Sequence, residues 1–121
     1  MFILHAFIIF AQENHNIMRR LDIVEKIRLI IREVAPDAEI ILFGSEARGE
    51  ARNDSDFDIL ILENADKITI ARRKEITYPL YMFAYSEGLD IQPLVRTKAE
   101  WENRPFPTAF FNNVSSDGIY L

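Results

Sequence analysis

Two carboxylates stand close together in the stretch FGSEARGEARNDSDFD (43–58), where Asp56 and Asp58 flank the start of the apolar run FDILIL (57–62). Successive side chains of a strand point to opposite faces, so these aspartates would share one face, with Cα atoms about 6.6 Å apart. Carboxylates that close repel each other unless a cation lies between them. Oxygen ligands of this charge suit Mg²⁺ or Mn²⁺, and such a pair can bridge the two ions that assist an in-line phosphoryl displacement.

A third carboxylate, Asp90, lies near the start of the run LDIQPLV (89–95), which has the pattern of another strand. Asp90 and Gln92 share a face of that strand. If the two strands are neighbours, Asp90 falls beside Asp58, where it would bind the inner ion and accept a proton from an attacking hydroxyl. Taken alone, Asp90 is explained equally well as an aspartate of a strand edge or a turn.

A small-residue turn precedes the carboxylates, with Gly44 and Ser45 directly after the apolar run EIILF (39–43). Glycine lets the backbone approach a ligand, and successive N–H groups at a helix start bind anions. The Ser45 hydroxyl adds a donor for a phosphate oxygen. Arg48 lies about one helical turn further on and can reach the same phosphate as a charge-assisted donor. Each of these signals is weak by itself, and together they predict a phosphate site.

The surrounding pattern predicts one α/β or α+β domain with a small sheet flanked by helices. The predicted elements, in chain order, are a helix over 20–34, strands over 39–43 and 57–62, a helix within 64–87, a strand over 89–95 and a short helix at 98–103. Pro79 is expected to kink or interrupt the second helix, and Gly88 to cap it. Pro93 implies that the third strand lies at a sheet edge or lacks one ladder bond.

Other polar and aromatic groups receive structural interpretations. Glu46 and Glu50 are expected to face solvent, as is a basic helix face at residues 72–74. The aromatic residues are interpreted mainly as packing, in two groups: Tyr78, Tyr81 and Tyr85 of the second helix, and Trp101, Phe106, Phe110 and Phe111 of the tail. A partner surface formed by the tail and the apolar N-terminus remains the alternative.

The length of 121 residues predicts a single domain, which we assign to residues 18–121. Residues 1–17 form an apolar N-terminal extension outside the core; its run of ten apolar-rich residues is about half of a membrane span and lacks the features of a signal peptide. The net charge of −5 argues against a general nucleic-acid binder. The absence of cysteine excludes disulfides and is compatible with a cytoplasmic location.

The spacing of these groups resembles a known family. Gly44-Ser45, then ten residues, then Asp56-x-Asp58 resembles the signature of the DNA polymerase β-like nucleotidyltransferase superfamily. More narrowly, LFGSEARGEARNDSDFDILI (42–61) is similar to the minimal nucleotidyltransferase branch, with its GSxARG turn and SDxD strand. Asp90 falls where that family places its third carboxylate.

The resemblance implies a mixed sheet flanked by helices and transfer of a nucleoside monophosphate, AMP in the case of ATP, with release of pyrophosphate. Gly44, Ser45 and Arg48 would hold the β- and γ-phosphates. Asp56 and Asp58 would coordinate two Mg²⁺ ions, and Asp90 would complete the inner one and activate the acceptor. The minimal branch commonly pairs with a helical HEPN-type toxin, which the antitoxin silences by adding AMP to a tyrosine.

Two other functions remain open. A related domain without activity would bind its partner as a module, although the retained carboxylates and Ser45 argue against that. Transfer to a small molecule or RNA would normally need a second domain to hold the acceptor, and a homo-oligomer could supply the missing wall.

Overall fold

The computed structural model describes residues 19–49, 56–104 and 108–121 of the chain. The predicted extension at residues 1–17, together with Glu50 and Phe106, lies outside these ranges. Within them, no helix combines the length and apolar character that a membrane crossing requires.

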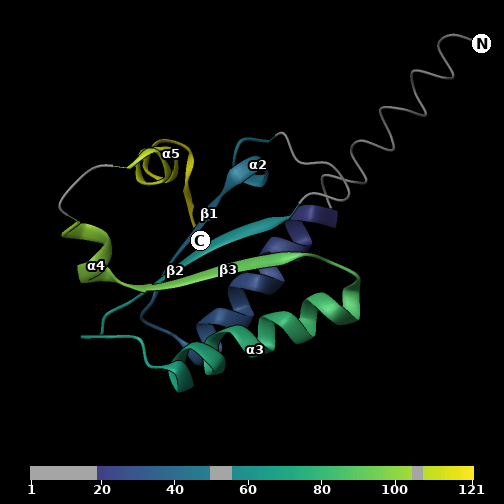
Figure 1. Ribbon diagram of the computed structural model, residues 1–121. Coiled ribbons are helices and arrows are strands. Elements are labelled where there is room, and N and C mark those ends of the chain that lie inside the picture. Colours follow the sequence, from purple (N-terminus) through teal and green to yellow (C-terminus); the bar gives the residue numbers. More distant parts are fainter. Residues whose placement is uncertain (1–18, 50–55, 105–107) are drawn as a thin grey trace, which may run out of the picture.

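Four strands form one mixed sheet in the order β3-β2-β1-β4 (Figure 1). Their bounds are β1 Glu39–Phe43, β2 Phe57–Glu63, β3 Ile91–Thr97 and β4 Ile119–Tyr120. β2 pairs antiparallel with β1 and parallel with β3, while β4 pairs antiparallel with the other edge of β1. The predicted α/β class with a small mixed sheet is confirmed. β3 lies at an edge of the sheet, as Pro93 indicated, and β4 was not predicted.

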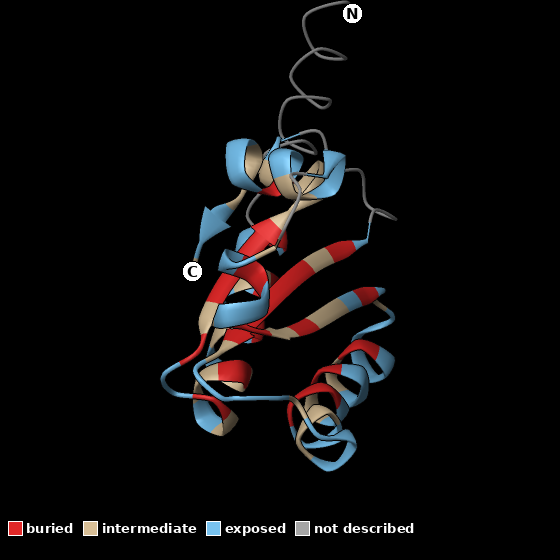
Figure 2. Ribbon diagram, turned by 60° about the vertical axis from the view of Figure 1, so that its left-hand side comes forward, coloured by how far each residue is buried: buried red, intermediate tan, exposed pale blue. Residues whose placement is uncertain are grey.

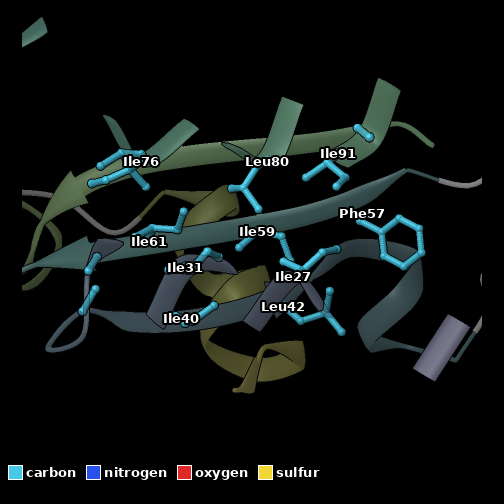
Figure 3. Packing of buried hydrophobic residues seen from close by; sticks show 14 of the residues in the cluster. Ile27, Ile31, Ile40, Leu42, Phe57, Ile59, Ile61, Ile76, Leu80 and Ile91 are labelled. Carbon is cyan, nitrogen blue, oxygen red and sulfur yellow. The ribbon is translucent and has the colours of Figure 1, made fainter. Parts of the chain in front are cut away.

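One face of the sheet is covered by two helices, the first helix (19–34) and α3 (Ile70–Glu87) (Figure 1). Their inward residues meet the side chains of alternate strand positions in a closely packed layer (Figure 3). The fully buried large side chains of this layer are Ile27, Ile31, Ile40, Phe57, Ile59, Ile61, Ile76, Leu80 and Val95. Burial of each such side chain contributes about 1.5–3 kcal/mol, so this layer is the main core.

The opposite face carries a smaller apolar cluster beneath α4 (Lys98–Glu102) and α5 (Ala109–Asp117). Leu60 and Leu62 of β2 point into it, whereas Phe57, Ile59 and Ile61 point into the main core. This alternation is the one predicted for β2. Trp101 is buried in the cluster, with its ring centroid 5.0 Å from that of Phe111. Most of the described tail aromatics therefore pack, although Phe110 remains 40% exposed.

The helix α3 begins and ends at the expected kinds of residue. The Thr69 hydroxyl accepts a hydrogen bond from the Arg72 amide at 3.0 Å, which caps the start of the helix. Gly88 has a φ of 66° and ends it in the left-handed conformation, as predicted. Pro79 was expected to kink or interrupt this helix, yet α3 runs through it without a break in helical assignment. The carbonyl of the exposed Glu75, which loses its helical donor at Pro79, can bond to water instead.

The tyrosines of α3 do not pack as predicted. Tyr78, Tyr81 and Tyr85 are 64%, 51% and 86% exposed. Figure 2 shows buried residues on the inward side of the helices and exposed residues on the outward side. The helical spacing of the three tyrosines was interpreted as an inward face of α3, but they lie on its outward face. The spacing misleads here because both faces of α3 carry apolar residues.

Candidate active site

The sheet topology brings the three predicted motifs to one end of the sheet. β1 ends there, while β2 and the parallel β3 both begin there. Asp58 of β2 lies between Phe43 of β1 and Gln92 of β3 in the strand register. The four-residue helix α2 (Gly44–Ala47) follows β1 directly, so the predicted phosphate turn starts beside the carboxylates.

Gly44 lies against Asp58. Its φ of 74° is in the left-handed region, and a Cβ added to it would lie 2.3 Å from Asp58 Oδ2. Glycine therefore suits this position in two ways, because it adopts the left-handed backbone without strain and leaves the Asp58 carboxylate where it is. Ser45 follows Gly44 in α2, and Arg48 is the C-terminal cap of that helix.

Asp58 is held in an environment that disfavours its charged form. Partial burial raises the pKa of Asp58, and the negative charges of Asp56 and Asp90 raise it further, while the Arg48 guanidinium acts in the opposite direction. These charges interact over short range, so the three predicted carboxylates and Arg48 belong to one electrostatic cluster.

Asp90 lies at the predicted end of β3, and the strands β2 and β3 are neighbours, as the prediction required. Gln92 is the partner of Asp58, and Phe57 is the partner of Ile91, so Asp90 precedes the paired segment and lies level with Asp56 rather than directly beside Asp58. The Asp90 carbonyl accepts a hydrogen bond from the Phe57 amide at 2.9 Å, and its Oδ1 accepts one from Gln92 Nε2 at 2.6 Å. Asp90 therefore reaches the cluster from the neighbouring strand.

The donor set fits a hard divalent cation in its chemistry. Asp56, Asp58 and Asp90 supply only carboxylate oxygens, and their mutual repulsion at Asp58 is the excess of negative charge that a cation would relieve. Among the described residues, however, no three acidic or histidine side chains already converge on a point where they could hold an ion. The predicted metal ligands are close in space without being gathered into a finished coordination sphere.

Sequence reasoning missed a buried ion pair beside this cluster. Glu46 of α2 was expected to face solvent, but its Oε2 lies 2.5 Å from Arg20 Nε, and the two side chains are 9% and 6% exposed. The Arg20 guanidinium also lies over the Phe57 ring, 4.2 Å from its centroid. Arg20 and Glu46 are 26 residues apart, so no local pattern in the sequence could have paired them.

The sequence of this chain matches a known protein family. Residues 24–104, which contain every predicted site residue, match the family profile described as a nucleotidyltransferase domain. The chain belongs to the nucleotidyltransferase domain family. The family predicted from the turn and the paired aspartates is thereby confirmed, and membership supports nucleotidyl transfer as the reaction class.

Relatives of this nucleotidyltransferase domain include one curated protein and several solved structures. A Methanocaldococcus jannaschii protein with the provisional name protein adenylyltransferase MJ1305 is 42% identical over 57 residues, which are 46% of this chain. The matched segment spans only 39% of that relative's length.

Two solved structures share the fold. The crystal structure of a toxin–antitoxin with AMP-PNP matches with a TM-score of 0.56 and 26% identity, covering 79% of this chain and 69% of that one. A variant of the toxin–antitoxin MntA-HpeT matches with a TM-score of 0.54 and 28% identity, covering 80% and 69% of the two chains.

Proposed function

We propose that this domain is a Mg²⁺-dependent nucleotidyltransferase that moves AMP from ATP to a hydroxyl of a partner protein. The single observation that carries the proposal is the cluster at one end of the sheet, where Asp56, Asp58 and Asp90 interact beside the Gly44 turn. Phosphoryl transfer depends on positioning and charge neutralisation, and this cluster offers groups suited to both.

The triphosphate would lie against the start of α2. Gly44 would leave room for a phosphate to approach the backbone, Ser45 would donate its hydroxyl, and Arg48 would supply a guanidinium whose charge is felt at Asp58. These groups would bind the β- and γ-phosphates and direct the α-phosphorus toward the carboxylates.

The carboxylates would prepare the chemical step. Asp56, Asp58 and Asp90 would hold Mg²⁺, which supplies positive charge to the reacting phosphates. The acceptor oxygen forms a bond to the α-phosphorus, the bond to the pyrophosphate oxygen breaks, and Asp90 accepts the proton of the hydroxyl. The exposed position of Asp90 at the edge strand leaves it accessible to an acceptor from outside this chain.

A partner protein is the acceptor that the relatives favour. One relative is provisionally named a protein adenylyltransferase, and the structural neighbours are toxin–antitoxin proteins, one of them with AMP-PNP. We extend this to a HEPN-type toxin as the acceptor, with this domain as its antitoxin, because the GSxARG and SDxD motifs resemble the branch that pairs with such toxins.

A label-transfer assay tests the proposal. The purified protein is incubated with Mg²⁺ and each α-³²P-labelled triphosphate in extract of its own cells. We expect a labelled protein band with ATP, lost with Asp58→Asn and retained with Asp66→Asn, an exposed aspartate beyond the far end of β2. A label that appears only on a small molecule or on RNA would overturn the protein acceptor. No label with any nucleotide would favour a binding module without activity.

A further inference from the structure

A buried ion pair connects three parts of the chain that meet at the candidate site. Arg20 belongs to the first helix, and Glu46 lies in α2 between Ser45 and Arg48. The Arg20 Nε to Glu46 Oε2 distance is 2.5 Å, and both side chains are less than a tenth exposed. Arg20 therefore attaches the phosphate turn to a long helix of the main core.

The same guanidinium contacts the strand that carries the paired aspartates. It lies 4.2 Å from the ring centroid of Phe57, which is fully buried and stands between Asp56 and Asp58. A planar guanidinium can stack on a ring and bond a carboxylate at once, which a lysine ammonium cannot reproduce. Arg20 thus contacts both the turn and the strand whose relative position defines the candidate site.

A gain in stability alone does not explain why a protein would contain a buried ion pair. Removing two charges from water is unfavourable, and apolar residues of similar volume often replace a buried ion pair with no loss of stability. An ion pair with a fixed geometry does, however, restrict the orientation of the elements that it joins. The short helix α2 has no side-chain cap at its start, and the Arg20 contact is one that can fix its orientation.

We propose that Arg20 and Glu46 are a positioning pair for nucleotide binding, which holds the Gly44–Ser45 turn at the correct distance from Asp56 and Asp58. The inference rests on the proposed function and adds two residues to it. Arg20 lies outside both motifs, and Glu46 occupies the variable position of GSxARG. Neither residue needs to touch the nucleotide, because both act through the elements that they orient.

Direct binding of AMP-PNP with Mg²⁺, measured by calorimetry, tests the pair independently of any acceptor. Glu46→Gln keeps the shape of the side chain and removes its charge, and we expect the Kd to rise at least tenfold. The matched control is Glu63→Gln, which breaks a second ion pair, Glu63 with Arg72 at 2.5 Å, at the far end of β2. The control is expected to lower the melting temperature and to change the Kd less than twofold.

A double variant separates positioning from stability. Arg20→Met with Glu46→Leu replaces the pair with apolar side chains. Compared with Glu46→Gln, which removes the Glu46 charge beside the buried Arg20, we expect the double variant to have a melting temperature closer to that of the unaltered protein. Its Kd is expected to stay raised. Binding is measured at a temperature at which all variants are folded. This variant also keeps the test usable if Glu46→Gln alone fails to fold.

The outcomes are distinguishable. Unchanged nucleotide affinity in Glu46→Gln, or recovery of the Kd together with the melting temperature in the double variant, would reduce the pair to a structural role and overturn the inference. Failure of the unaltered protein to bind AMP-PNP or any natural triphosphate would overturn the proposed function, and the positioning role with it.

Discussion

Gly44 gives the sharpest test of how the turn and the carboxylates are arranged. Replacing it with alanine introduces two separate effects. The backbone at Gly44 has a φ of 74°, which strains any side chain, and the new Cβ would lie 2.3 Å from Asp58 Oδ2. The first effect acts on the stability of the fold, whereas the second acts on the position of a predicted metal ligand.

The two effects differ in size. Left-handed backbone in a residue other than glycine costs roughly 1–2 kcal/mol, which for a domain near 100 residues lowers the melting temperature by about 5–10 °C. To restore an ordinary contact of 3.4 Å, the Asp58 carboxylate must move by about 1 Å. That movement is cheap for the fold because the clashing atom ends a side chain, but a 1 Å displacement at a reacting centre can reduce activity about 100-fold.

Two other glycines of this chain supply matched controls. Gly49 and Gly88 have φ values of 73° and 66°, and a Cβ at either position would meet nothing within 4 Å. We expect Gly44→Ala, Gly49→Ala and Gly88→Ala to lose similar stability in thermal unfolding. In the label-transfer assay, only Gly44→Ala is expected to reduce the transfer activity about 100-fold, while Gly88→Ala at the end of α3 retains that activity within threefold.

Equal activities of Gly44→Ala and Gly88→Ala would refute the reasoning, because the contact between Gly44 and Asp58 would then be irrelevant to the reaction. A loss of stability at Gly44 far beyond that of the two controls would contradict the argument in another way. It would mean that Asp58 cannot move and that the clash is absorbed by the backbone.

Three further predictions concern stability. The pKa of Asp58 is raised in the folded state, so its ionisation makes the protein less stable as the pH rises through that pKa. Asp58→Asn should therefore raise the metal-free melting temperature at pH 7 and leave it unchanged at acid pH. A lower melting temperature at pH 7 would contradict this. Pro79→Ala should add about 1 kcal/mol in urea unfolding, because the new amide can bond to the Glu75 carbonyl, and a loss of stability would show that the proline is required in α3. Leu80→Ala should cost about 2–5 kcal/mol in the same measurement, while Met82→Ala, half-exposed on the same helix, changes it by less than about 0.5 kcal/mol.

Much of the fold could be predicted because its determinants are local. The β-branched runs, the alternation along FDILIL and the Gly88 cap all act within a few residues, and each is found where the pattern placed it. β4 escaped prediction because two residues carry no period. The exposed tyrosines of α3 escaped it because helical spacing defines a face but does not identify what that face contacts.

In the candidate site, too, only the features that depend on neighbouring residues could be predicted. The types and spacing of Gly44, Asp56 and Asp58 could be interpreted from the chain alone, since the chemistry depends on neighbours in sequence. The position of Asp90 relative to Asp58 depends on the register of two strands that are about thirty residues apart, and that register, which places Asp90 level with Asp56, is not encoded locally. The Arg20 contact depends on how a helix packs on the sheet, which no local pattern encodes.

The edge strand β3 limits how another protein can approach the carboxylates. Because the Phe57 amide bonds the Asp90 carbonyl in a parallel pair, the even-numbered residues of β3 direct their backbone groups to β2, and the odd-numbered ones direct theirs outward. Pro93 therefore removes the central donor of the free edge. The Val95 carbonyl on the same edge accepts hydrogen bonds from Arg73 Nη1 at 3.1 Å and from Arg96 Nη1 at 2.8 Å.

An edge with a missing donor and an occupied acceptor is a poor template for an added strand. Regular backbone pairing of a partner chain alongside Asp90 is therefore disfavoured. If a partner protein is the acceptor, as proposed, we expect it to present its target as a side chain reaching over the face of the sheet. Recognition would then depend on the shape of that side chain's surroundings and not on an extended segment. The same features disfavour the joining of folded copies of this protein through the β3 edge.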